Sequence, residues 1–407
     1  MLPAAFRLAA LGVLTSLSAA GAQTAKTAAP AAPPSAPAAA AAERAGPTLP
    51  PPPVVLRAPP VRPNPPPVLS TGLRLGGVDY VTVTDFALWL GFKGAGVDPL
   101  RALTLTDKSN PANQVELAAD SREAGVNGVR IFLGEKVFAR NSHLYLSRTD
   151  AERALAPLLR PGLSGRLPPP PKIIVLDPGH GGEDPGTENK ALGLKEKNLT
   201  LDVALRLKKL LEAAGYKVLL TRSEDVALSS NKAVDLALRP DFANREHADL
   251  FVSIHFNAAT KDTRGTEVFT YAPRGQHATD WWGQLSHDDA ALEKGEQPVN
   301  RFDPWNSALA GALHKRMLQT LKTEDRGKKI AHWAVLKTLN CPGVLVEPAI
   351  ITNDADARRV AVPAFRQQIA EALAAGVRDY AVTLDALRPK PSAPPAVTPS
   401  MTTATSK

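Results

Sequence analysis

Short apolar runs alternate with amphipathic segments between residues 172 and 385, and this alternation constrains the fold more than any other feature. Lys172–Leu176 predicts a buried strand that ends in an Asp-Pro-Gly turn. From Glu196 to Ala214, apolar residues recur at steps of three and four, which predicts a helix closed by Gly215. Further strands are predicted at 218–221, 250–254 and 344–346, and further helices at 307–321 and 363–382. We therefore expect an α/β fold, a mostly parallel twisted sheet of about six strands with helices on both faces.

Side chains that bind metals or move protons follow three of these strands. His180 follows the first strand between glycines, His255 directly follows residues 250–254, and Glu347 ends the strand at 344–346. The carboxyl ends of such strands border the crevice in which α/β proteins bind their ligands. The glycines allow a tight turn that exposes the imidazole of His180. Glycine-rich turns also bind phosphate, but a phosphate site would not need the histidine.

Glu196 begins the predicted helix, and its role has two interpretations. A carboxylate is favoured at a helix N-terminus by the helix dipole, whatever its function. Together with His180 and His255, however, it makes a two-histidine, one-glutamate set that is known for catalytic zinc and leaves one position open for water. Glu347 is then a candidate general base beside the metal. The alternative for Glu347 is a structural salt bridge, with Arg326 or Lys337.

Together these segments resemble the zinc-dependent N-acetylmuramoyl-L-alanine amidases of bacterial cell-wall turnover. Their order and separation agree over a little more than half of the chain. The matching segments are 174–182, 194–197, 221–222, 243–244, 253–257, 265–268, 306–310, 326–328 and 344–347.

The resemblance implies a mostly parallel sheet and a Zn²⁺ cofactor held by His180, Glu196 and His255, with Glu347 as the catalytic glutamate. Asn257 and Arg326 lie in matching segments and are candidates for contacting the substrate or supporting the ligands. The implied reaction is hydrolysis of the amide between N-acetylmuramic acid and the L-alanine of peptidoglycan. Peptidoglycan and a protein activator are the expected partners, and cell-wall remodelling or daughter-cell separation the expected role.

Two other functions compete with this interpretation. A zinc carboxypeptidase acting on stem peptides would place histidine and glutamate three positions apart, whereas Glu196 lies much further from His180. A non-catalytic wall-binding protein derived from an amidase would be indicated by loss of a ligand or of the glutamate. None of these residues is lost, so hydrolysis is favoured.

The sequence departs from the family pattern at three places. Pro348 and the residues after it replace the usual small residue, Gly and Phe, and Pro240 interrupts a segment that is usually a plain helix. The segment Ala272–Trp305 is longer than in the simplest relatives. It holds three tryptophans, Trp281, Trp282 and Trp305.

We expect the segment Ala272–Trp305 to start at the sheet edge near the active crevice, because it follows the strand 266–271. One hypothesis is a plug, with a short helix at Asp288–Lys294 that brings Glu293 or Glu296 to the open zinc position. Some wall amidases carry such a blocking helix. The alternative is a surface excursion whose tryptophans pack for stability.

Proline distribution marks the boundaries of the chain's parts. Many of the 38 prolines lie in runs such as 50–53, 65–67 and 168–171. We expect a signal peptide at 1–22, a Pro/Ala-rich linker at 23–67, a small α+β domain at 68–160, a linker at 161–171, a catalytic domain at 172–385 and a disordered tail at 386–407. Small residues follow the apolar stretch at 8–17 and end in an A-x-A pattern at 20–22, which predicts export to the periplasm or cell envelope without a lasting membrane span. The alternative is an uncleaved anchor.

The small domain contains a faint repeat. Residues 80–85 and 145–150 each predict a strand and a Thr-Asp helix cap, followed by a short helix at 86–90 or 151–155. The pattern weakly resembles the small domain near the N-terminus of copper amine oxidases, which is also attached to bacterial wall proteins. It carries no catalytic cluster, so we expect it to bind the wall or a partner, or to act as a spacer.

The net charge limits the classes of partner, and the cysteine content limits how the fold can be stabilised. The net charge of +8 suits an anionic wall polymer, an anionic lipid or nucleic acid, but no nucleic-acid-binding motif is present and we expect no nucleic-acid partner. The chain has one cysteine, Cys341, which excludes an internal disulfide and predicts a small buried apolar residue.

Overall fold

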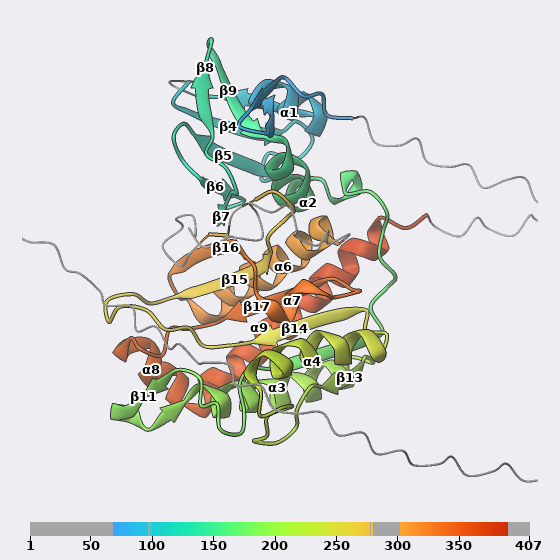
Figure 1. The fold of residues 1–407 in the computed structure, drawn as a ribbon. Helices are drawn as coiled ribbons and strands as arrows, with labels where there is room; N and C mark the ends of the chain where they lie inside the picture. The colour runs from blue at the N-terminus through green and yellow to red at the C-terminus, as the bar shows by residue number, and fades with distance from the viewer. Residues whose placement is uncertain (1–67, 97, 99, 277, 280–301, 390–407) are drawn as a thin grey trace, which may run out of the picture. The chain divides into compact units, whose positions relative to one another are not determined.

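The computed structural model describes residues 68–96, 98, 100–276, 278–279 and 302–389 (Figure 1). All of them fall within one compact unit, Pro63–Lys407. The predicted signal peptide, the linker at 23–67 and most of the predicted tail lie outside the described residues. Within the described part of the chain, every helix is too short or too polar to cross a membrane.

An eleven-stranded mixed sheet runs through the described residues in the order β13-β10-β14-β17-β15-β16-β7-β6-β5-β4-β3. Neighbours among its first six strands are parallel, except that β15 is antiparallel to β17. Those six strands are β10 (Ile173–Pro178), β13 (Lys217–Leu220), β14 (Leu250–Ile254), β15 (Thr266–Tyr271), β16 (Asp325–Ala331) and β17 (Gly343–Glu347). The α/β prediction is confirmed, but the sheet is larger and more mixed than the predicted six mostly parallel strands.

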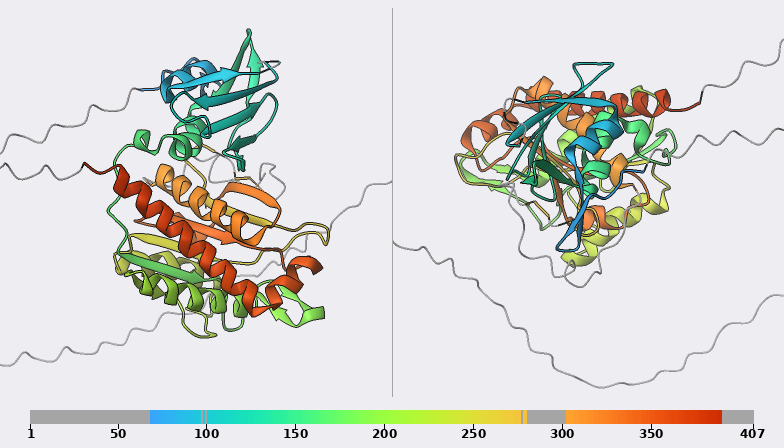
Figure 2. Two further views of the ribbon diagram at one scale, coloured as in Figure 1. Left: turned by 180° about the vertical axis from the view of Figure 1, so that it is seen from behind. Right: turned by 90° about the horizontal axis from the view of Figure 1, so that it is seen from above.

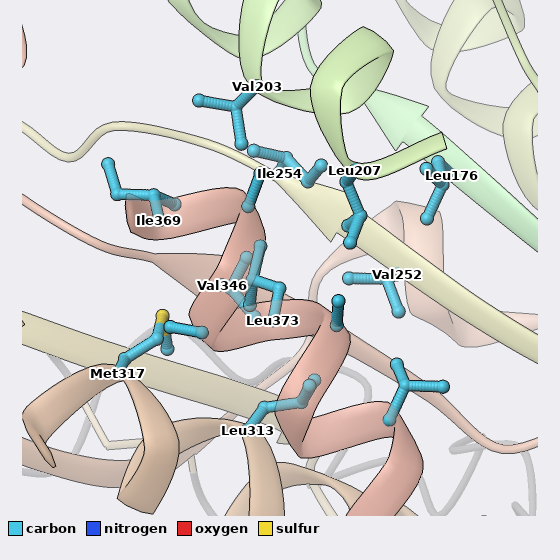
Figure 3. Close-up of a cluster of buried hydrophobic side chains, with 14 of the residues drawn as sticks. Leu176, Val203, Leu207, Val252, Ile254, Leu313, Met317, Val346, Ile369 and Leu373 are labelled. Carbon is cyan, nitrogen blue, oxygen red and sulfur yellow. The ribbon is translucent and has the colours of Figure 1, made fainter. Parts of the chain in front are cut away.

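Both faces of this part of the sheet are covered by helices. Alternate side chains of one strand point to opposite faces, so Leu176 and Val175 of β10 belong to different cores. Leu176 packs with residues of α3, α6 and α9 (Figure 3), whereas Val175 packs with residues of α4 and α7. Figure 2 shows α9 alongside α6. The helices are α3 (Glu196–Ala213), α4 (Lys232–Arg245), α6 (Asp303–Leu321), α7 (Ala334–Lys337), α8 (Asp354–Ala361) and α9 (Pro363–Ala386).

Helix α4 continues through Pro240, which the sequence marked as an interruption. Proline removes one N–H from the helical hydrogen bonds but does not end this helix. Asn231 caps its start by accepting a hydrogen bond from Val234 N. A short two-stranded ribbon, β11 (Glu188–Asn189) with β12 (Leu194–Lys195), precedes α3.

Residues 68–160 form the remaining strands and a second small sheet. The elements are β1 (Leu73–Leu75), β2 (Val78–Thr82), α1 (Val83–Leu90), β3 (Phe92–Ala95), β4 (Ala102–Asp107), β5 (Gln114–Ala118), β6 (Glu123–Val126), β7 (Val129–Phe132), β8 (Phe138–Arg140), β9 (His143–Ser147), a π-helical turn Asp150–Leu155 and α2 (Ala156–Leu159). The strands of the two predicted repeats, β2 and β9, pair with each other. The first predicted cap is displaced, because Thr82 and not Thr84 accepts the hydrogen bond from Asp85 N.

The small α+β region joins the following region through the sheet itself. Strand β7 pairs in parallel with β16, where Ile131 lies opposite Lys328. The backbone N–H of Arg130 donates to Asp325 Oδ2 at 2.7 Å. Beside this pairing, Arg153 forms an ion pair of 2.8 Å with the buried carboxylate of Asp303. The domain boundaries remain predictions, but the sheet crosses the predicted boundary.

The direction of β15 corrects one prediction. Glu267 lies opposite Glu347 and Phe269 opposite Leu345, so β15 starts beside Glu347 and runs away from it. Ala272 therefore lies toward the edge of the sheet opposite Glu347, and the expectation that Ala272–Trp305 starts near the crevice is wrong. The helix hypothesis at Asp288–Lys294, with Glu293 and Glu296, lies outside the described residues, as do Trp281 and Trp282. Trp305 is buried and donates to Arg166 O at 2.8 Å.

Candidate active site

The three predicted metal ligands converge at one edge of the sheet. Because β10 and β14 are parallel neighbours, His180 and His255 leave the sheet at the same edge. Glu196, the first residue of α3, lies between them. One ligand atom from each residue lies within 4.8 Å of the others. The residues of the predicted set are thus brought together from three separate elements.

Glu196 accepts hydrogen bonds on both carboxylate oxygens. Its Oε1 lies 3.1 Å from His180 Nε2 and 3.0 Å from His255 Nδ1 and accepts from Phe256 N, and its Oε2 accepts from Thr187 N at 2.7 Å. Burial raises the pKa of Glu196, but the hydrogen bonds from the two histidines outweigh it and hold the pKa below its ordinary value. The carboxylate is therefore kept ionised, the form that binds a metal ion.

Close packing around the three candidate ligands leaves no room for side chains at two glycines. A Cβ at Gly179 would lie 2.2 Å from the His255 ring. Gly186 has a φ of +66°, and a Cβ there would lie 2.7 Å from both Glu196 and His180. The two imidazole rings meet edge to face, with centroids 4.9 Å apart. The sequence singled out the glycines beside His180, but the need for Gly186 arises only from folding.

A buried polar network lies beneath the His180 turn. Asp177 is fully buried and accepts from Thr221 Oγ1 at 2.6 Å, Ser253 Oγ at 2.8 Å and Arg239 Nη1 at 2.8 Å. Burial raises the pKa of Asp177, but Arg239 and these hydrogen bonds lower it further than burial raises it. Nearby, Arg222 donates to the carbonyl oxygens of residues 178, 179, 197 and 224. These residues fix the backbone from which His180 projects.

Glu347 lies at the same edge in very different surroundings. It ends β17, which is parallel to β14, and its side chain is buried. Its Oε2 has no hydrogen-bond partner among the residues that the structure describes. Burial raises the pKa of Glu347 well above its ordinary value, and the nearby carboxylates of Glu196 and Glu267 add to this, while Lys329 opposes them. Such a carboxyl group is suited to take up and return a proton.

The other two candidate residues gather around Glu267, the cross-strand neighbour of Glu347. Asn257 Nδ2 donates to Glu267 Oε1, and Arg326 Nε lies 3.4 Å from Glu267 Oε2. Lys329 Nζ donates to the same Oε2 at 2.6 Å. Arg326, the alternative salt-bridge partner of Glu347, thus lies against a different carboxylate. The sequence analysis missed Glu267, although the matching segment 265–268 contains it.

The residues present fit a metal ion through the chemistry of their donors. Two imidazoles and a carboxylate that is held ionised form a set typical of catalytic zinc. A cleft of about 520 Å³ adjoins His180 on the side of α4 and is lined by Asp184, Ser229, Ser230 and Lys232 among others. The arrangement combines a candidate site for a cation, a buried carboxyl group with a raised pKa, and space beside His180.

Comparison with known proteins points to one family. Residues 174–379 match the family described as N-acetylmuramoyl-L-alanine amidase. The amidase AmiC of Neisseria meningitidis is 35% identical over 237 residues, 54% of this chain and 54% of that protein. The amidase AmiA of Escherichia coli is 33% identical over 226 residues, 51% of this chain and 76% of that protein.

The match to the Neisseria protein spans about half of that relative's length. Among solved structures, an N-acetylmuramoyl-L-alanine amidase of Nostoc punctiforme is 29% identical, with 51% of this chain and 96% of that one covered and a TM-score of 0.40.

Proposed function

This chain belongs to the N-acetylmuramoyl-L-alanine amidase family, and we propose that it hydrolyses the amide bond between N-acetylmuramic acid and L-alanine in peptidoglycan, with zinc as its cofactor. The observation that carries the proposal is the convergence of His180, Glu196 and His255 beside Glu347 at one edge of the sheet. When bound, zinc supplies a Lewis acid that polarises the scissile carbonyl.

Each residue of the chain then has a defined part. His180, Glu196 and His255 would hold the cation, a three-ligand set of the kind found in catalytic zinc sites. Glu347 takes a proton from the attacking water and returns it to the nitrogen of the leaving L-alanine. Asn257 and Arg326 support this half of the site by holding Glu267 in place.

The proposal extends to location and role. Peptidoglycan lies outside the cytoplasmic membrane, so the predicted signal at residues 1–22 fits export to the periplasm or cell envelope. We propose that the enzyme acts in cell-wall remodelling or daughter-cell separation, that a protein activator regulates it, and that residues 68–160 help it reach the wall. Removing these residues also removes the pairing of β7 with β16, so targeting and stability must be measured separately.

Digestion of purified peptidoglycan tests the bond that is cleaved. The fragments released by the zinc-loaded protein are identified by mass spectrometry. Free stem peptides with an L-alanine amino terminus are expected. Shortened stem peptides still attached to muramic acid would instead indicate a carboxypeptidase. Binding to peptidoglycan without release of fragments would indicate a non-catalytic wall-binding protein.

A further inference from the structure

His180 is held in a backbone conformation that few residues adopt. Its φ is +63°, in the left-handed region, which is uncommon for a residue with a Cβ. A conformation of this kind persists only when the surrounding structure enforces it. The preceding residue, Gly179, places little restriction on the backbone. The imidazole of His180 must nevertheless face Glu196 if the two side chains are to bind the same cation. Something other than local preference therefore has to fix this residue.

Helix α4 supplies the contacts that fix the backbone of His180. Arg239 Nη2 donates to His180 O, and Nη1 donates to Pro178 O, both at 3.0 Å. The guanidinium is itself held by Asp235 one turn earlier, whose Oδ2 accepts from Nε at 2.9 Å. Arg239 is buried, with 2% of its surface exposed, so these bonds are shielded from water. A planar guanidinium can hold both carbonyl oxygens at once.

The same helix reaches the imidazole ring through a carboxylate. His180 Nδ1 lies 2.8 Å from Asp184 Oδ2, while Nε2 of the ring faces Glu196. Lys232, at the start of α4, forms a hydrogen-bonded ion pair with that same Oδ2. Asp184 Oδ1 accepts from Gly186 N at 3.1 Å, which fixes the carboxylate on its other side. A carboxylate on the outer nitrogen of a metal-binding histidine orients the ring and raises metal affinity.

Lys232, Asp235 and Arg239 share one face of α4, because helical residues three and four positions apart are neighbours. Here that face meets the turn that carries His180. We propose that α4 is a clamp on the metal site, and that Lys232, acting through Asp184, is a positioning residue that sets how tightly the site holds zinc. The inference rests on the proposed function, since it takes zinc as the cation.

Lys232 offers the cleanest test, because its side chain is 56% exposed and its loss should not unfold the protein. Lys232→Met is expected to weaken zinc affinity about tenfold, the lower end for residues that support metal ligands. Lys232→Arg should restore most of the affinity. Arg245→Met is the matched control, since Arg245 is an exposed residue of the same helix whose ion pair is with Asp241.

Zinc affinity is measured by competition with a chromophoric chelator, alongside the melting temperature without metal. Visible absorption of the cobalt-substituted protein reports whether the ligand geometry changes. Combining Lys232→Met with Asp184→Asn tests whether Lys232 acts through Asp184. In the Asp184→Asn background, Lys232→Met should cause no further change in zinc affinity. The expected result is weaker zinc binding and an altered cobalt spectrum, with an unchanged melting temperature without metal.

Two results would overturn the proposal while leaving the amidase function intact. One is unchanged zinc affinity and unchanged KM in Lys232→Met. The other is a higher KM with unchanged zinc affinity, which would make Lys232 a substrate contact in the cleft beside His180. A wild-type chain that binds no zinc would overturn both this proposal and the proposed cofactor.

Discussion

Glu196 and Glu347 are two buried glutamates at the same edge of one sheet, and their surroundings are opposite. Glu196 accepts hydrogen bonds on both oxygens, and its pKa is lowered. Glu347 has an oxygen without a described partner, and its pKa is raised. When the surroundings of two carboxyl groups shift their pKa values in opposite directions, the shifts suggest which group acts as a charged ligand and which as an acid or base. In the proposed function, Glu196 stays charged beside the cation and Glu347 exchanges a proton.

The largest effect in this comparison is expected when Glu196 or one of its histidine partners is removed. Glu196→Ala, like His180→Ala or His255→Ala, should leave a folded protein with greatly reduced zinc content and no amidase activity, because an open site loses one of three ligands. Zinc is measured by atomic absorption and folding by circular dichroism. Glu188→Ala is the control, since Glu188 is an exposed glutamate eight positions earlier. Full zinc occupancy in a ligand variant would show that the residue does not bind the metal.

The next test removes the carboxyl group of Glu347, which is proposed to transfer the proton. Glu347→Gln should retain zinc, because Glu347 is assigned to proton transfer and not to coordination. Turnover of peptidoglycan fragments should fall by at least ~10²-fold, the low end for a positioned acid–base group. Near-normal turnover in the zinc-loaded variant would contradict the assignment. Loss of zinc would instead place Glu347 among the ligands and erase the contrast with Glu196.

A smaller change should sharpen the contrast by altering the surroundings of Glu347. Glu267→Gln removes a like charge that raises the pKa of Glu347 and leaves the opposing charge of Lys329 in place. Loss of the Glu267 charge therefore lowers the pKa of Glu347. The limb of the pH profile of kcat/KM on which activity rises with pH should therefore move to lower pH.

The matched control for Glu267→Gln is Glu324→Gln, which changes an exposed glutamate paired with Arg264. The control should leave the pH profile unchanged, and the melting temperature of both variants shows whether the fold is intact. An unmoved limb in Glu267→Gln would mean that Glu347 does not produce it.

The smallest effect on activity is expected from the buried network around Asp177, which lies beneath the His180 turn. Ser253→Ala removes one of three side-chain hydrogen bonds to the buried, charged Asp177 and should lower the free energy of unfolding by about 2 kcal/mol. Zinc content and turnover should stay near those of the wild type, because Thr221 and Arg239 still hold Asp177. Urea denaturation measures the stability. A large loss of activity without loss of stability would show that this network acts on the chemistry directly.

Polar residues at strand ends could be recognised from the sequence, and His180, His255 and Glu347 all follow buried strands. Glu196 could be added because its spacing and helix start match the family. The supporting residues could not be found in the same way. Asp184 and Lys232 meet across 48 positions, and each alone is an ordinary charged residue on a loop or a helix start.

The direction of each strand and the order of the strands in the sheet could not be predicted from the sequence either. Alternating strands and helices favour a parallel sheet, and nothing local shows that β15 runs against β17. That reversal led to the wrong expectation for the start of Ala272–Trp305. The pairing of β7 with β16 joins residues 195 positions apart, such as Arg130 and Asp325, and the proline run between them favoured separate parts.

The packing at Gly179 also limits how the chain can vary. With the His255 ring 2.2 Å from where a Cβ would stand, even alanine has no space there. A library that randomises residues 177–182 and selects for hydrolysis should return glycine at position 179 in every survivor. A larger side chain at position 179 is available only to lineages that first replace the imidazole of His255, and with it the proposed metal ligand.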